Sequence, residues 1–543
     1  MERASAQDDT SPTASSKKEF HDLQFVEPFF LFVVLPATLC AFYSAGRYLG
    51  PLVATAALVV ASAVFYAPYG SQATSLLAAS LLMNIAIGGA LSHYQSSRWL
   101  RAALLGAGLF LNFLALATFK YVDQVAELIN PSAGPIIGVA IPAGISFYTF
   151  HQSVFLLDAY NRKTEVLVFL KGTYSFLGKL SAFTRYAAFV ALFPQLVIGP
   201  ITYMSEVGPQ LQRRSFGRLR IVDLQVGTTL IVIGLFKKLC IADPVGDIVN
   251  AVYRALAAGV PISQTDADFA VIGYYFQLYF DFSGYSDIAL GIARLFGICL
   301  PINFDSPLRA TGISDFYRRW HITLTRVIAL FLFTPLSLWG ARAAMGRGYA
   351  GWRSKALAVW LPLLANFQII ALWHGANGTF IVFGAIHGAW YVIETEIRSS
   401  RAFALFRSKT SDRFRTIGGM AITTLLLALT FALFRSRSLA EFGSLLARLA
   451  AFGTLGSAVV VPTKWYWVLV AAIAAIVYLL PNVYEIARFY RPGIVTFVNP
   501  STTPNLLRAK WRPDLLWALF VAALAVGVFM RIHHPSHFLY AGF

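Results

Sequence analysis

The sequence predicts an all-α, polytopic membrane protein. Of its 543 residues, 57% are hydrophobic and 13% are charged, whereas about 25% of the residues in an ordinary soluble domain are charged. The mean hydropathy is +0.62. Long runs without a charged residue recur along the chain, and about 20 mostly apolar residues let a helix cross a bilayer. A soluble globular protein is therefore excluded, and so is a chain that is disordered over most of its length.

Charge-free apolar runs locate the membrane segments. Runs that fit one crossing each are residues 28–46, 102–119, 128–157, 186–205, 416–434, 465–484 and 515–530. Residues 48–97 and 356–393 fit two crossings each, and shorter candidates are 224–236, 268–280, 284–300 and 327–341. Together they predict about 11–13 membrane-embedded helices. Pro194, Gly199 and Pro200 interrupt 186–205. This segment is therefore either broken or re-entrant, or it is a crossing helix that places the basic residues after it outside the cytoplasm, against the usual distribution of Lys and Arg.

Three regions are predicted along the chain. Residues 1–27 are polar, lack the apolar stretch of a cleavable signal peptide and predict a disordered tail. Residues 28–445 form the membrane core. Residues 446–543 add membrane helices and loops, to which no chemistry is assigned.

The excess of positive charge lies in short loops. Lys and Arg outnumber Asp and Glu by 44 to 26, but the cations flank apolar runs and do not gather on one face. This pattern is typical of loops on the cytoplasmic side of a membrane and argues against a nucleic-acid partner. Residues 94–101, 158–185 and 394–415 are the predicted cytoplasmic loops. The basic stretch 206–220 joins them only if 186–205 is re-entrant.

Most enzyme and metal-site signatures are absent from the sequence. The three cysteines show no CxxC spacing, and no cluster of His and Cys suggests a metal site. There is no GxSxG, HExxH, Walker loop or GxGxxG that would indicate a known soluble-enzyme site.

Ionisable residues inside predicted membrane segments are the functional candidates, because each costs roughly 2.5 to 3.5 kcal/mol to insert. Asp281 and Asp287 lie six residues apart in one such segment. In the segment ISDFYRRWHITLTR (313–326), a helix that starts at Ser314 would carry Arg318, His321 and Thr325 on one face. A simpler interpretation is an interfacial amphipathic helix whose arginines meet lipid headgroups.

Two further histidines, His374 and His387, lie in the charge-free run 356–393. Asn377, three residues after His374, is expected to share its helix face. A histidine away from water stays neutral, and a general base must be a neutral imidazole. The alternative is a histidine that only links helices by hydrogen bonds. We expect one of the pair to be functional and the other structural.

These segments belong to a series of motifs in a fixed order. They are IPAGISFYTF (141–150), LFPQLVIGPI (192–201), GLFKKLCIAD (234–243), YFDFSGYSDIALGIARLFGICLPINFDSP (279–307), ISDFYRRWHITLTR, LWHGANGTF (372–380) and FGAIHG (383–388). Together they resemble the membrane-bound O-acyltransferase (MBOAT) family, specifically its bacterial branch that takes part in alginate O-acetylation. The resemblance covers residues 28–445.

The resemblance implies a ring of helices around a central funnel, in the inner membrane of a bacterium, and an O-acyltransferase activity. It implies that His374 is the catalytic histidine and that His321 is a second essential or supporting residue. We expect His374 to accept the proton of an acceptor hydroxyl, while His321 or Asn377 positions the donor carbonyl or stabilises its oxyanion. The expected supporting or donor-binding residues are Asn377, Trp320, Arg318, Arg319, Asp281, Asp287 and Trp373.

The expected donor is acyl-coenzyme A or an acyl-carrier thioester, with no permanently bound cofactor or metal. The expected partners are membrane lipids and either a polysaccharide acceptor, as in exopolysaccharide O-acetylation, or a periplasmic acetyltransferase. One alternative is a transporter in which His374 and His387 gate protons and Asp281 and Asp287 bind cations. Another is an inactive scaffold that keeps the fold.

Overall fold

The chain is helical, and the computed structural model describes residues 25–94, 96–130, 136–138, 141–171, 175–451, 463–496, 509–533 and 538–539. Among these residues there is no β-strand, only an isolated bridge between Pro301 and Ile494. Residues 1–24 of the predicted tail lie outside this description. Phe25 and Val26, which the sequence assigned to that tail, are buried.

The helices of the first half are interrupted in several places by short π-helical or 3-10 turns. They are η1 (Phe30–Val34), α1 (Leu35–Tyr48), α2 (Pro51–Tyr66), η2 (Ala67–Tyr69), α3 (Ser71–His93), α4 (Arg98–Ile129), α5 (Ile145–Tyr160), α6 (Thr164–Lys171), α7 (Phe176–Val190), α8 (Phe193–Leu196), α9 (Met204–Leu211), α10 (Ile221–Leu235), η4 (Phe236–Ala242), α11 (Asp243–Ala257) and α12 (Gln264–Leu295).

The second half continues with the elements that surround the candidate site. They are η5 (Pro307–Arg309), α13 (Ile313–Arg319), α14 (Ile322–Ile328), η6 (Ala329–Phe333), α15 (Thr334–Gly346), α16 (Gly351–Lys355), η7 (Ala356–Trp360), α17 (Leu361–His374), α18 (Gly378–Ser399), α19 (Arg401–Lys409), α20 (Asp412–Arg435), α21 (Leu439–Ala450), α22 (Thr463–Leu479), α23 (Val483–Ala487), η8 (Arg488–Tyr490) and α24 (Leu515–Arg531).

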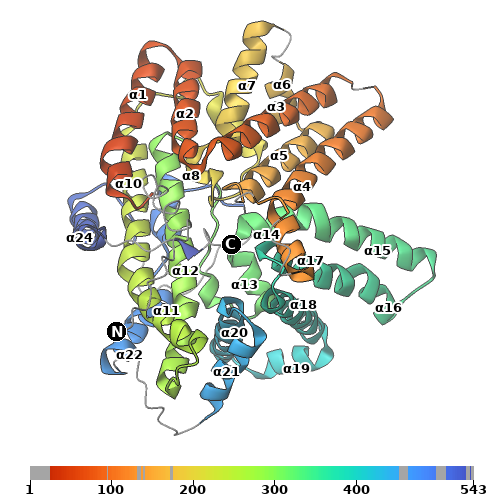
Figure 1. Cartoon of the computed structure of the whole chain (residues 1–543), viewed down its shortest axis with the longest axis vertical. Coiled ribbons are helices and arrows are strands. Elements are labelled where there is room, and N and C mark those ends of the chain that lie inside the picture. The colour runs from red at the N-terminus through yellow and green to blue at the C-terminus, as the bar shows by residue number, and fades with distance from the viewer. Residues whose placement is uncertain are drawn as a thin grey trace, which may run out of the picture.

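Ten helices in the described part of the chain are long and apolar enough to cross a membrane. The runs 48–97 and 356–393 each contain two of them, as predicted. Counting also the buried helices α5 and α12 and the shorter apolar helix α24 brings the total into the predicted range. The protein is thus an all-α, polytopic membrane protein. Figure 1 shows the short helices α8, α13 and α14 near the middle of the molecule, with longer helices around them.

Helix α12 is the most deeply buried long element. The sequence predicted two short segments, 268–280 and 284–300, but Gln264–Leu295 is one continuous helix. Its glycines let α10 approach closely, because a Cβ on Gly284 would lie 2.8 Å from the carbonyl oxygen of Gly234. Its buried residues Asp281, Asp287 and Arg294 form ion pairs with η4 and α10, so a helix that carries charges can run through the interior without a break.

Two predicted single crossings are broken in the structure. The run 128–157 is divided between α4 and α5, and Gly144 before α5 has a left-handed conformation with φ +72°. The run 186–205 ends α7 at Val190, forms only the four-residue α8, and continues without a helix to Tyr203. The structure therefore agrees with the broken form of this segment. Broken backbone at membrane depth is tolerated where protein buries it, and residues 190–202 are nearly all buried.

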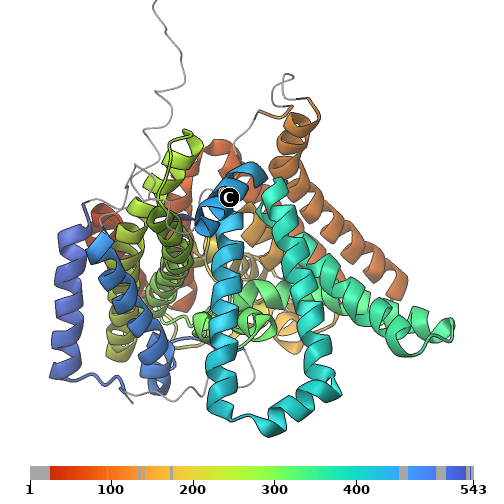
Figure 2. The same ribbon diagram turned by 90° about the horizontal axis from the view of Figure 1, so that it is seen from below.

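The predicted basic loop 394–415 is largely helical. It forms the end of α18, all of α19 and the start of α20, and Figure 2 shows α19 joining the ends of these two long helices. The side of the membrane on which this loop lies stays a prediction.

Candidate active site

A small cavity lies where α12, α13, α14, α17, α18 and α20 meet. Its volume is about 40 Å³, and about 10–15 Å³ suffices for one water molecule. Most of its lining is apolar. The polar groups on its wall come from His321, His374, Tyr317, Thr325 and Trp320. The two histidines that the sequence singled out therefore line the same cavity, although they lie 53 residues apart in the chain.

His374 is the last residue of α17. The helix ends there because Gly375 has φ +151°, a conformation that other residues rarely adopt. The imidazole is buried and packs edge-on against Phe434, with 4.9 Å between ring centroids, and beside Trp373 at 4.8 Å. The His374 imidazole thus lines the cavity from the end of a helix, between two aromatic rings.

His321 lies between two short helices and not on one continuous helix. Helix α13 ends at Arg319, α14 begins at Ile322, and His321 has a left-handed backbone with φ +44°. The expectation that Arg318, His321 and Thr325 share a helix face is therefore wrong. The predicted start at Ser314 is wrong as well, because Gly312 caps α13 and the Ser314 hydroxyl donates to Glu394.

Asn303 holds His321 from a loop that precedes η5. Its side-chain oxygen lies 3.0 Å from the Nδ1 atom of His321, and its backbone oxygen accepts from the N–H of Ile322 at 3.0 Å. A non-glycine residue with a positive φ costs free energy and persists only when its surroundings fix it. Asn303 supplies two of the contacts that do so. The sequence analysis did not single it out, although it lies in the quoted motif ending PINFDSP.

His387 is the structural histidine of the pair. Its Nδ1 atom lies 2.7 Å from the Tyr317 hydroxyl, and its Nε2 atom lies 2.8 Å from the Thr430 hydroxyl. The ring also stacks on Phe383 at 4.0 Å. Both nitrogens bind protein groups, and His387 is not among the described residues that line the cavity. It links α18 to α13 and α20.

Asn377 does not share a helix face with His374, which is a correction to the expectation. Gly375 ends α17 first, so Asn377 instead caps α18, with its side-chain oxygen 3.4 Å from the N–H of Thr379. Its amide nitrogen donates to the carbonyl of Arg437 at 2.9 Å. Both ends of this side chain are engaged in joining α18 to the segment after α20.

Asp281 and Asp287 form ion pairs with η4, away from the cavity lining. Asp281 lies 2.6 Å from the ammonium group of Lys238, and Asp287 lies 2.6 Å from that of Lys237. Asp281 also accepts from the N–H of Leu539 at 3.0 Å, and Asp287 accepts from the Tyr484 hydroxyl. These contacts explain how α12 carries buried carboxylates, and they occupy the groups that the transporter alternative requires as cation ligands.

The aromatic and basic residues near His321 separate into two groups. Trp320 lines the cavity and stacks on Phe316 at 5.3 Å. The guanidinium of Arg319 pairs with Asp315 at 2.9 Å, and the Arg318 side chain is 72% exposed. Neither arginine is among the described residues that line the cavity. Trp320 thus lines the cavity, whereas a donor-binding role for the two arginines stays a prediction.

Trp373 connects His374 to a buried cation. Its ring centroid lies 6.3 Å from that of His321, and its carbonyl accepts a hydrogen bond from Lys120. Lys120 is buried and also lies over the Trp373 ring, 5.1 Å from its centroid. This lysine, in the segment NFLALATFKY (112–121), is a second residue near the site that the sequence analysis did not select.

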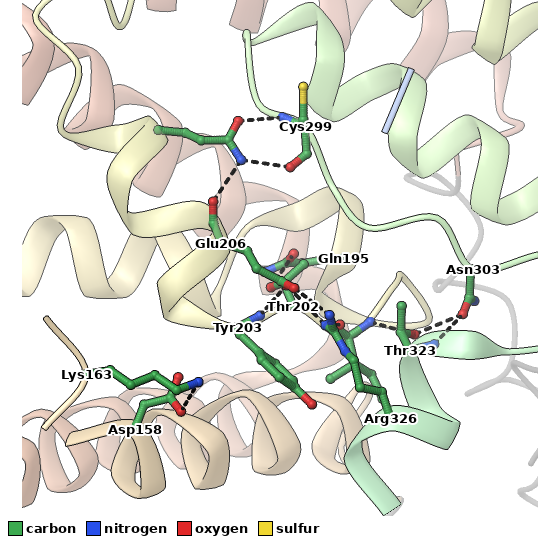
Figure 3. A network of polar contacts seen from close by, with 12 residues as sticks. Asp158, Lys163, Gln195, Thr202, Tyr203, Glu206, Cys299, Asn303, Thr323 and Arg326 are labelled. Atoms are coloured by element: carbon green, nitrogen blue, oxygen red, sulfur yellow. Dashed lines mark hydrogen bonds and ion pairs between the residues drawn. The ribbon is translucent and has the colours of Figure 1, made fainter. Parts of the chain in front are cut away.

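A polar network ties the broken segment to α14 (Figure 3). Arg326 pairs with Glu206 of α9 at 2.5 and 3.1 Å and covers the ring of Tyr203 at 3.9 Å. One turn before Arg326, the Thr323 hydroxyl accepts from the N–H of Ile201 at 3.1 Å. The same hydroxyl lies 2.9 Å from the side-chain oxygen of Asn303. The network therefore reaches from the LFPQLVIGPI motif to the partner of His321.

The model of the membrane-bound O-acyltransferase family matches residues 111–438. The chain belongs to this family. The matched range includes both cavity histidines, Asn303 and Lys120. MBOAT membership and the membrane-crossing helices together make the protein a multi-pass O-acyltransferase of a bacterial membrane.

Named relatives cover between 47% and 95% of the chain. It is 35% identical over 381 residues to a peptidoglycan O-acetyltransferase of Helicobacter pylori, which covers 67% of this chain and 69% of the relative. It is 30% identical over 533 residues to a protein of Pseudomonas putida named probable alginate O-acetylase AlgI, covering 95% and 99%. It is 26% identical to a teichoic acid D-alanyltransferase of Streptococcus thermophilus, covering 47% and 63%. These similarities place the chain in the bacterial, AlgI-like branch.

Proposed function

We propose that this protein transfers an acetyl group from a cytoplasmic thioester to a hydroxyl group of an exported polysaccharide or of a periplasmic partner protein. The observation that carries the proposal is the shared cavity inside the helical body, which both His374 and His321 line. A donor and an acceptor entering from opposite faces would meet there, out of bulk water.

The chemistry is an acyl transfer with His374 as the general base. The imidazole accepts the proton of the acceptor hydroxyl while the oxygen attacks the thioester carbonyl. The resulting tetrahedral intermediate expels the thiolate, and the proton on His374 passes to the departing sulfur. One C–O bond forms, one C–S bond breaks, and the imidazole ends neutral.

The size of the cavity supports a short acyl group. A space of about 40 Å³, lined by Phe316, Phe383 and Phe434 among others, suits a two-carbon group better than a fatty chain. Two of the relatives carry O-acetylation in their names, which points in the same direction. The donor, in this proposal, is acetyl-coenzyme A or an acetylated carrier protein.

The test uses the purified full chain in lipid nanodiscs. Acetyl-coenzyme A and an acetylated carrier protein are supplied separately, and the release of free thiol is measured with and without a polysaccharide acceptor. We expect thiol release from one donor, with transfer of a labelled acetyl group to the acceptor. Mass analysis of exported glycans from cells with and without the gene identifies the acceptor. Failure of both donors to lose acetyl groups, in protein that remains folded, would refute the proposal.

A further inference from the structure

Asn303 is a fully buried residue outside any helix, and its side-chain amide contacts two neighbouring helices. Its side chain reaches Ser286 of α12 through Nδ2, at 3.4 Å, and α14 through Oδ1. Figure 3 shows this amide beside Thr323, at the end of the polar network. Its side-chain oxygen also lies 3.0 Å from Nδ1 of His321.

The atom that faces His321 must be the oxygen of the amide. The backbone N–H of Thr323 can only donate, and it lies 3.3 Å from this atom. The Thr323 hydroxyl, 2.9 Å away, already accepts from the N–H of Ile201, so its own hydrogen is available for Asn303. Two independent donors therefore fix the orientation of the amide.

The tautomer of His321 follows from that orientation. Its Nδ1 atom lies 3.0 Å from an oxygen that only accepts, so Nδ1 carries the hydrogen. In a neutral imidazole the other nitrogen, Nε2, then has a lone pair and acts as an acceptor. The left-handed backbone of His321 and the bond from the Ile322 N–H to the Asn303 carbonyl keep the main chain of His321 beside Asn303.

We propose that Asn303 is a positioning residue that holds His321 with Nε2 as a hydrogen-bond acceptor for the acyl acceptor. This inference rests on the proposed function. The oxyanion of the intermediate requires a donor, so His321 in this tautomer does not serve it. A sugar carries hydroxyl groups beside the reacting one, and a neighbouring hydroxyl can donate to His321 while the reacting hydroxyl donates to His374.

The decisive measurement observes the tautomer directly. Full-length protein in nanodiscs, labelled with ¹⁵N in its histidine rings, is studied by solid-state NMR, with the His321 signal assigned from its loss in His321→Gln. We expect hydrogen on Nδ1 and none on Nε2 in the wild type and in Asn303→Asp, whose carboxylate also accepts. We expect Asn303→Leu, which has no acceptor, to lose this preference. A wild-type ring with hydrogen on Nε2 would overturn the inference.

Kinetics provide a second readout that support of the loop alone would not move. Asn303→Leu should raise the KM for the acceptor about tenfold, as expected for one lost hydrogen bond. Asn303→Asp should restore the KM. An unchanged acceptor KM in folded Asn303→Leu would contradict the proposal, as would a failure of Asn303→Asp to recover it.

A matched control separates positioning from general loss of a buried amide. Asn84 is equally buried and pairs with Asn112 at 2.9 Å, in the contact between α3 and α4. Asn84→Leu should lower stability but leave the His321 tautomer and the acceptor KM unchanged. If Asn303→Leu does not fold, the ¹⁵N spectra of the wild type and of Asn303→Asp still show whether Nδ1 of His321 carries the hydrogen. If the wild type transfers no acyl group, the proposed function fails, whereas the tautomer is still measured.

Discussion

His374 and His387 lie 13 residues apart in one helical hairpin, yet their surroundings differ completely. His374 ends α17 and faces a cavity, whereas His387 has a protein partner on each ring nitrogen and an aromatic ring stacked on its face. The Thr430 hydroxyl donates to the carbonyl of Leu426, so it accepts from Nε2 of His387. The Tyr317 hydroxyl then donates to Nδ1.

The comparison shows that a buried polar residue becomes available for chemistry where the structure leaves space in front of it. A histidine whose nitrogens are both occupied contributes to stability through those bonds. A histidine at a helix end, beside a cavity, can exchange its contacts for those of a substrate. In the same way, Trp320 and His321 line the cavity, whereas Arg319 and Asp281 are held in ion pairs outside its lining.

Replacement of His374 by alanine is the strongest test of this contrast. We expect kcat for acetyl transfer to fall about 10²–10⁴-fold, the usual contribution of a general base, with normal insertion into the membrane. The measurement is labelled-acetyl transfer by equal amounts of purified protein. Full activity in His374→Ala would mean that the cavity is not the reaction site.

Asp281→Asn tests a buried polar group that is bound by protein partners and does not line the cavity. Lys238 has a fully buried side chain and loses its ion pair with Asp281 in this change, while its pair with Asp243 stays, so we expect a loss of about 3 kcal/mol in unfolding free energy. Asp268→Asn is the control, because Asp268 is partly exposed and takes part in no ion pair among the described residues. Denaturation in detergent measures both. A change in donor KM with unaltered stability would favour a binding role for Asp281.

His387→Ala should have the opposite effect to His374→Ala, because it should lower stability and leave kcat nearly unchanged. We expect a loss of about 2–3 kcal/mol in unfolding free energy, because a buried ring and two hydrogen bonds disappear. Surviving folded protein should keep a kcat near that of the wild type. The thermal midpoint and the transfer rate, measured on one preparation, check both statements. Loss of activity without loss of stability would reverse the roles assigned to the two histidines.

Asn377→Ala is expected to have the smallest effect. The substitution removes a helix cap, which costs about 0.5–2 kcal/mol of stability. An oxyanion donor would instead cost about 10²–10³ in kcat. We expect kcat to change only by a small factor, because both ends of this side chain already bind α18 and the carbonyl of Arg437. A large fall in kcat would extend the site across the turn after His374.

Some of the fold could be predicted because membrane helices depend on local composition. The runs 48–97 and 356–393 each formed two helices, since apolar residues without charges meet the bilayer requirement whatever their neighbours are. The helix end at His374 was not predicted, because Asn377 was expected to lie on the same helix face.

The break at His321 could not be predicted from its segment, since ISDFYRRWHITLTR has neither glycine nor proline to interrupt a helix. The cause lies in Asn303, on another loop, which binds both the His321 ring and the next backbone N–H. The continuous α12 was missed for a related reason. Lysines on η4 compensate carboxylates that, in the sequence alone, mark the end of an apolar segment.

The sequence by itself determined that the chain is helical, that it crosses a membrane many times, and that its histidine motifs are those of an acyltransferase family. Only the tertiary structure decided which histidines share a cavity and which one has a protein partner on each ring nitrogen. The apolar composition of one segment is enough to make it a membrane helix. The cavity and the hydrogen-bond partners of the histidines, in contrast, are formed by segments far apart in the chain.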